Sequence, residues 1–127
     1  MNHRLLPIIA FVLSLVFWGC GNIAHSLLCH HSTQSEAASP GQHYIADVVR
    51  DDCGATEHAT VVTIRRNGIV SNRTDLLTVE DTHHIELSWI DEHTLSVRCD
   101  DCGPRDVQQT IRQWRDVTVQ YKLWATN

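Results

Sequence analysis

The chain has 127 residues and a formal net charge of −5, from 10 basic and 15 acidic side chains. The acidic residues begin at Glu36, and Arg4 is the one basic residue before that position, so the later part of the chain carries a charge of about −6. A domain with this charge is poorly suited to bind nucleic acid or an anionic lipid surface. The length suits one small domain rather than several.

Residues 1–24 have the pattern of an export signal or a membrane anchor. Arg4 precedes an apolar run, residues 5–18, and no further Lys or Arg occurs until Arg50. This asymmetry of charge predicts that the N-terminus stays inside the cytoplasmic membrane and that the rest of the chain lies outside it.

Three interpretations of this segment remain open. A cleaved signal peptide would end near residue 26, whereas a spanning helix would need the whole of 5–24 to reach about 20 residues. A bacterial lipoprotein signal would make Cys20, which lies in a Gly-Cys-Gly-Asn string, the lipidated N-terminus. We favour retention at the membrane, by helix or by lipid, over release, so the membrane is an expected partner of this segment.

The segment 25–42 predicts an extracytoplasmic tether, because small and polar residues dominate it and no apolar period is present. Cys29 falls within this tether. The folded domain is predicted to span 43–127. A domain of that size buries little core per residue and commonly needs a covalent cross-link.

Apolar and polar residues alternate along most of the predicted domain. The alternation is clearest in 84–89, 94–99 and 117–123. A period of two is typical of strands in an antiparallel sheet, with one face buried and the other exposed. The segments 44–50 and 59–66 are rich in Val, Ile and Thr, which also favour strands. We therefore predict an all-β domain, a small antiparallel sheet or sandwich of five to seven strands.

Short polar segments between these strands predict turns. Asn67-Gly68 predicts a two-residue hairpin turn, because both residue types accept a positive φ. The segments 91–93 and 115–116 also predict tight turns. The stretch 104–114 fits a helix or a strand, and we favour a strand over 110–114 because a turn follows it directly.

Several strings of the chain resemble a group of short bacterial envelope proteins, membrane-anchored or lipoprotein-like, whose function is uncharacterised. The strings are Ser-Pro-Gly at 39–41, Asp-Cys-Gly-Ala-Thr at 52–56, and Leu-Ser-Val at 95–97 after Trp89. The string at 52–56 is the most distinctive of them. The resemblance implies an envelope-anchored β domain and assigns no catalytic residue.

The cysteines are the main chemical lead in the predicted domain. Outside the cytoplasm, cysteines of a small domain are expected to form disulfides. The string Val-Arg-Asp-Asp-Cys-Gly at 49–54 recurs in a longer form at 97–103, which gives Cys53 and Cys102 equivalent places after a strand. We therefore predict a bridge from Cys53 to the Cys99/Cys102 pair, with Cys102 as the preferred partner. The strand period points Cys99 toward the core.

Two other uses of these cysteines stay open. A redox-active Cys-x-x-Cys at Cys99 and Cys102 would need a stabilised thiolate, which two intervening aspartates disfavour. A metal site would combine Cys53, Cys99 and Cys102 with one histidine. The candidate histidines are His58, His83 and His84.

The sequence thus assigns no catalytic residue, no cofactor and no metal site. The leading interpretation is a non-enzymatic accessory or binding module, attached to the envelope outside the cytoplasmic membrane, that meets another envelope protein. The alternative is a thiol-redox or metal-binding protein that uses Cys53, Cys99 and Cys102.

Overall fold

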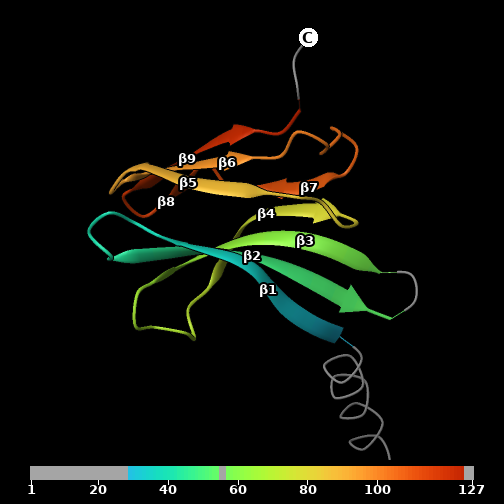
Figure 1. Cartoon of the computed structure of the whole chain (residues 1–127), viewed down its shortest axis with the longest axis horizontal. Coiled ribbons are helices and arrows are strands. Elements are labelled where there is room, and N and C mark those ends of the chain that lie inside the picture. The colour runs from blue at the N-terminus through green and yellow to red at the C-terminus, as the bar shows by residue number, and fades with distance from the viewer. Residues whose placement is uncertain (1–28, 55–56, 125–127) are drawn as a thin grey trace, which may run out of the picture.

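A computed structural model of the chain describes residues 29–54 and 57–124, which form a sandwich of two β-sheets (Figure 1). Sheet A has five strands in the order β1-β2-β3-β4-β7, and sheet B has four in the order β5-β6-β9-β8. The strands are β1 (Cys29–Ala38), β2 (Tyr44–Cys53), β3 (His58–Arg66), β4 (Thr74–Glu80), β5 (Glu86–Asp91), β6 (Thr94–Arg98), β7 (Val107–Thr110), β8 (Gln113–Trp114) and β9 (Val117–Lys122).

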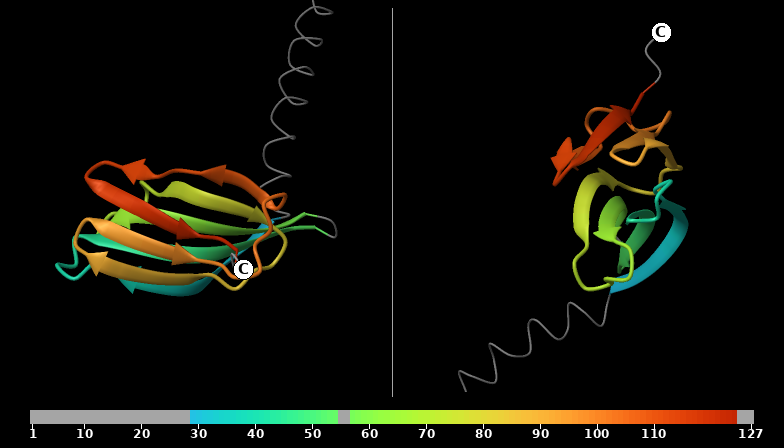
Figure 2. Two further views of the ribbon diagram at one scale, coloured as in Figure 1. Left: turned by 90° about the horizontal axis from the view of Figure 1, so that it is seen from above. Right: turned by 90° about the vertical axis from the view of Figure 1, so that its left-hand side faces the viewer.

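The two sheets lie face to face, and Figure 2 shows them as separate layers. The core lies between them, and the alternation of the sequence explains which side chains fill it. Burial of each Val, Leu or Ile side chain in this core contributes about 1.5–3 kcal/mol to the stability of the fold. The buried aliphatic residues of this core are Ala46, Val48, Val62, Ile64, Leu76, Leu77, Val79, Ile85, Leu95, Val97, Val117, Val119 and Leu123.

The all-β prediction is confirmed, but the described residues form nine strands rather than five to seven. One strand that the sequence did not predict is β4, in which the adjacent residues Leu76 and Leu77 are both fully buried. The pairing of β3 with β4 shifts register between Val62 and Thr63, so β4 contains one extra residue at this point. Such a bulge breaks the period of two, and this is why the strand was not visible in the sequence.

Another unpredicted strand is β1, which occupies most of the segment expected to be a tether, 25–42. β1 pairs antiparallel with β2 along its whole length and forms the outer edge of sheet A. Its side chains are mostly exposed. Backbone pairing with β2, rather than burial of an apolar face, holds the strand, so its polar sequence resembles a linker. Sheet A therefore includes residues 29–38 of the segment expected to be a tether.

The pairing is not antiparallel throughout, because β6 and β9 run parallel. After β6 the chain crosses to sheet A, adds β7 to it, and returns to sheet B as the β8–β9 hairpin. The strand predicted over 110–114 falls on this return, so β7 ends at Thr110 and β8 begins at Gln113. The helix alternative for 104–114 is wrong.

Two of the three predicted turns are confirmed. Glu92 and His93 connect β5 to β6, and Arg115 and Asp116 connect β8 to β9. At the third predicted turn, Asn67-Gly68, Gly68 has a φ of 82°, as a turn requires. However, β4 begins only at residue 74, so a longer loop follows and the two-residue hairpin is wrong.

The signal or anchor segment predicted over 1–24, with Cys20, lies outside the described residues. Among the residues that the structure does describe, no helix is long and apolar enough to cross a bilayer.

At the turn end of the sandwich, Glu92 joins sheet B to the β1–β2 turn of sheet A. Its carboxylate accepts hydrogen bonds from Ser39 Oγ at 2.7 Å and from the backbone N–H of Gly41, and it lies 2.8 Å from His43 Nδ1. Burial raises the pKa of Glu92, but these hydrogen bonds outweigh it and lower the pKa to about 2. The ionised carboxylate therefore stabilises the contact between the two sheets.

The pKa of Glu92 predicts a dependence of stability on pH. Because the folded pKa lies below the ordinary value of 4.5, the stabilisation is complete above about pH 4.5 and is lost as the pH falls toward 2. We expect Glu92→Gln to lower the urea midpoint of unfolding at pH 7 and to lower it much less at pH 3, measured by circular dichroism. The control is Glu57→Gln, at an exposed position. An equal decrease of the urea midpoint at pH 7 and at pH 3 would contradict the role of the ionised carboxylate.

Candidate functional site

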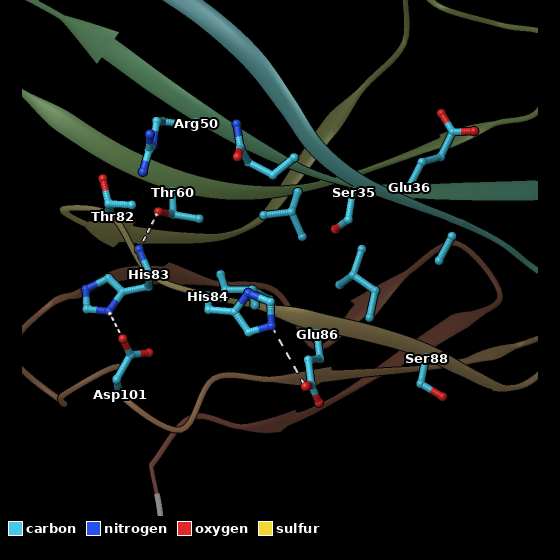
Figure 3. A pocket seen from close by; sticks show the side chains of 15 residues that line it. Ser35, Glu36, Arg50, Thr60, Thr82, His83, His84, Glu86, Ser88 and Asp101 are labelled. Atoms are coloured by element: carbon cyan, nitrogen blue, oxygen red, sulfur yellow. Dashed lines mark hydrogen bonds and ion pairs between the residues drawn. The ribbon is translucent and has the colours of Figure 1, made fainter.

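A groove of about 810 Å³ runs between the two sheets, on the side where β1 and β5 are the outermost strands (Figure 3). Consecutive residues of both strands line it, 34–37 of β1 and 86–88 of β5. Because neighbours along a strand point to opposite faces, this lining means that the strand edges themselves border the groove. Val48 and Ile85, which belong to the core, form part of its apolar lining.

Trp89 ties the two edges together near one end of this groove. Its indole Nε1 donates a hydrogen bond of 3.0 Å to the backbone oxygen of Ala37 on β1. Farther from the turns, Ser35 of β1 and Ser88 of β5 line the groove with small side chains, and in Figure 3 Ser88 points away from β1. The edges are therefore joined at Trp89 and leave open space beyond it.

The free edges of β1 and β5 are the chemical feature of this groove. In the described chain each of these strands pairs on one side only, so each has backbone N–H and C=O groups on its other side. Each of the two strands has one irregularity, between Thr33 and Ser35 in β1 and between Trp89 and Asp91 in β5, and β5 pairs with β6 in unbroken register from Glu86 to Trp89. The unbroken part of β5 thus lies along the groove.

The far end of the groove is formed by the segment 81–85, which crosses from sheet A to sheet B. The backbone N–H of His83 donates to Thr60 Oγ1 at 3.1 Å, and this hydroxyl donates to the backbone oxygen of Asp81 at 2.8 Å. His83 is largely buried, with 12% of its side chain exposed, and His84 is 86% exposed. The two histidines therefore face opposite sides, as expected of neighbours in an extended chain.

His83 has a close neighbour but no hydrogen bond at its Nδ1 atom. Asp101 Oδ2 lies 3.4 Å away, within ion-pair range, yet Nδ1 is buried without a hydrogen-bonding partner. In Figure 3 the ring of His83 and the carboxylate of Asp101 point toward each other. Asp101 is 63% exposed and lies between the two cysteines that follow β6.

Within residues 29–54 and 57–124, the structure contains two disulfides, Cys29–Cys53 and Cys99–Cys102. The predicted bridge from Cys53 to Cys102 is therefore wrong. Cys53 ends β2 in sheet A and stands opposite Cys29 in the register of β1 and β2, whereas Cys102 follows β6 of sheet B. Because the polar sequence of 25–42 predicts a tether, it gives no sign that Cys29 lies beside Cys53.

The expectation for Cys99 is confirmed, since 1% of its surface is exposed. Cys102 is fully buried. The metal site considered for Cys53 together with these two residues does not form, because Cys53 is bonded to Cys29 in sheet A. The described residues instead bring together His83, Cys99, Asp101 and Cys102. Of these, Asp101 was missing from the sequence-based set, although its place inside the Cys-x-x-Cys was a usable signal.

The fold is thus a two-sheet β-sandwich with two disulfides and a groove between two strand edges. No family model matches the chain, and no curated protein or solved structure is significantly similar to it. The resemblance to short bacterial envelope proteins accordingly stays a prediction.

The two disulfides predict how cysteine substitutions combine. Cys53→Ser should lower the free energy of unfolding by about 3 kcal/mol, because the bridge closes a loop between residues 24 positions apart. Cys29→Ser with Cys53→Ser should cost about as much as either change alone. Cys53→Ser with Cys102→Ser should lower the free energy of unfolding by the sum of the two single effects, because the residues belong to different bridges and different sheets.

Urea unfolding of the oxidised chain, with its single and double variants, measures these values. If the pair Cys53→Ser and Cys102→Ser cost no more than one of them alone, the two residues would share a bridge and the assigned connectivity would be wrong.

Proposed function

We propose that the chain is a non-enzymatic binding module, attached to the cell envelope outside the cytoplasmic membrane, which holds an extended segment of a partner protein. Two features support the location. The N-terminal pattern over 1–24 is that of an export signal or anchor, and both disulfides suit an oxidising compartment.

The observation that carries the binding role is the groove bordered by two strand edges. An extended peptide can add to such an edge as a further strand, with backbone hydrogen bonds that supply affinity and side-chain pockets that supply specificity. β5 is the template, because its register over 86–89 is unbroken and it runs along the groove. A strand paired with these four residues is about 13 Å long.

The composition of the groove favours a peptide with alternating side chains. The apolar lining at Val48 and Ile85 would receive the inward residues of an added strand, while Arg50 and Glu86 lie where polar residues would meet water. A ligand of this kind needs no catalytic group, and the proposal gives none of these residues a catalytic role.

Site-specific cross-linking in the native host tests the binding role. A photoreactive amino acid at Ser88, or at Ser35 across the groove, should form a discrete adduct with one partner protein through a single linear segment of it. The matched control is Gln120, which is exposed on β9 of the same sheet, away from the groove. Adding Ser35→Trp, which fills the groove, should abolish the adduct at Ser88. Adducts of equal yield at Gln120, or none at Ser88 and Ser35, would contradict a partner held in the groove.

Attachment to the envelope is tested by fractionation of the native host. We expect the wild-type protein to sediment with membranes. If lipid is the anchor, Cys20→Ser should release the protein from the membrane. If a helix is the anchor, the same variant should stay membrane-bound at full length. Cys29→Ser is the control for loss of a cysteine. A soluble wild-type chain that begins near residue 26 would rule out retention.

A further inference from the structure

Four side chains with metal-binding atoms converge at the end of the sandwich away from Glu92. One ligand atom each from His83, Cys99, Asp101 and Cys102 can be chosen so that all four lie within 4.8 Å of one another. The residues come from the crossing segment before β5 and from the turn after β6. They are therefore brought together by the packing of the two sheets and not by sequence proximity alone.

The buried nitrogen of His83 that makes no hydrogen bond is the observation that points to a ligand. Nδ1 of His83 is buried without a hydrogen bond, which is costly unless the atom has a partner in some state of the protein. The hydrogen bond of its backbone N–H to Thr60 Oγ1 holds the residue beside Asp101 and the two sulfurs. A ring nitrogen of His83 thus lies within 4.8 Å of the other three ligand atoms before any ion binds.

The disulfide occupies the two sulfur ligands in the oxidised state. Cys99 Sγ lies 3.2 Å from Asp101 Oδ1, but a bonded sulfur carries no proton to donate, so this contact is not a hydrogen bond in that state. Once the bridge is reduced, the thiol of Cys99 can donate to Asp101, and both sulfurs become available as thiolates to a cation. The state of the bridge therefore decides whether the cluster has two ligands or four.

We infer that the Cys99–Cys102 disulfide and a zinc site are two alternative states of the same residues, and that the reduced chain binds one Zn²⁺ through His83, Cys99, Asp101 and Cys102. Two sulfurs, one imidazole and one carboxylate are ligand types of tetrahedral zinc, and the Cys-x-x-Cys spacing is common in such sites. At zinc–ligand distances of about 2.0–2.3 Å, neighbouring ligand atoms lie about 3.3–3.8 Å apart. The two sulfurs, which are bonded to each other in the oxidised state, therefore need to separate on reduction, while the other ligand atoms, all within 4.8 Å, need to approach only slightly. This inference is independent of the proposed peptide-binding role.

The conversion requires a dithiol reductant. One thiolate of the reductant attacks a sulfur of the bridge, and its second thiol resolves the mixed disulfide. The S–S bond of Cys99 and Cys102 breaks, the two residues become thiols with two electrons and two protons gained, and the reductant becomes a disulfide. Zn²⁺ then displaces the two thiol protons into solution. Bound zinc keeps both sulfurs from forming the bridge again.

Zinc titration of the purified full-length chain tests the inference. The chain is reduced anaerobically with a phosphine, freed of metal, and titrated with Zn²⁺ against a chromophoric chelator. We expect one zinc ion bound per reduced chain and none bound by the oxidised chain. Co²⁺ in place of zinc should give a thiolate-to-metal charge-transfer band and the intense visible absorption of a tetrahedral site.

Substitutions assign the ligands. Loss of a residue that merely supports a ligand costs metal affinity about 10–100-fold, so His83→Ala should weaken zinc binding at least tenfold. The control is His84→Ala, because His84 is exposed and outside the cluster. His83→Ala keeps both thiols, and circular dichroism of each variant shows whether it is folded.

Reduction also breaks the Cys29–Cys53 bridge, so the zinc affinities of variants in the two cysteine pairs are compared. Cys29→Ser with Cys53→Ser should leave zinc affinity unchanged, and Cys99→Ser with Cys102→Ser should abolish binding. The inference is overturned if the reduced wild type binds no zinc, if Cys99→Ser with Cys102→Ser still binds it, or if His83→Ala and His84→Ala have the same affinity.

Discussion

The packing of Trp89 against the edge of sheet A determines how the two sheets lie on each other. Its indole bonds the backbone of Ala37, while its ring stacks on Tyr44 with centroids 6.3 Å apart. Tyr44 in turn meets Trp114 edge-on at 5.7 Å and donates a hydrogen bond of 2.6 Å to Asp116. Aromatic pairs with these geometries are worth about 0.5–1.5 kcal/mol beyond the area they bury. Sheet B is therefore anchored to sheet A at the end where the hairpin turns lie.

This anchoring explains why the groove opens toward the opposite end. Glu92 and Trp89 join the sheets near the β5–β6 turn, and beyond that point residues 34–36 of β1 and 86–88 of β5 line the groove. At the far end the chain itself connects the sheets through 81–85 (Figure 2). The groove thus extends from an aromatic contact to a chain crossing, and His83 lies at that crossing.

The two proposals concern the same side of the molecule but rest on different chemistry. Peptide binding depends on the backbone edge of β5, whereas zinc binding depends on the side chains of His83, Cys99, Asp101 and Cys102. His83 and Asp101 also line the groove, so an ion held by them would change the charge at its far end. Any influence of one site on the other would have to pass through these two residues.

The local pattern of the sequence was sufficient to predict strands and turns. The alternation of Leu95 and Val97 with polar neighbours depends only on residues close in the chain, and it correctly indicated strands with one buried face. The turns at 92–93 and 115–116 followed for the same reason. The oxidising chemistry of the cysteines was also predictable, although the identity of the partners was not.

Only the tertiary structure decided which strands pair and which side chains meet. β1 is held by backbone pairing with β2, and such pairing leaves no signature in a polar sequence, so Cys29 could not be recognised as the partner of Cys53. The parallel pairing of β6 with β9 depends on where the chain crosses between sheets. The same crossing brings His83 to Cys99, because contacts between residues distant in the chain arise only when the two sheets pack.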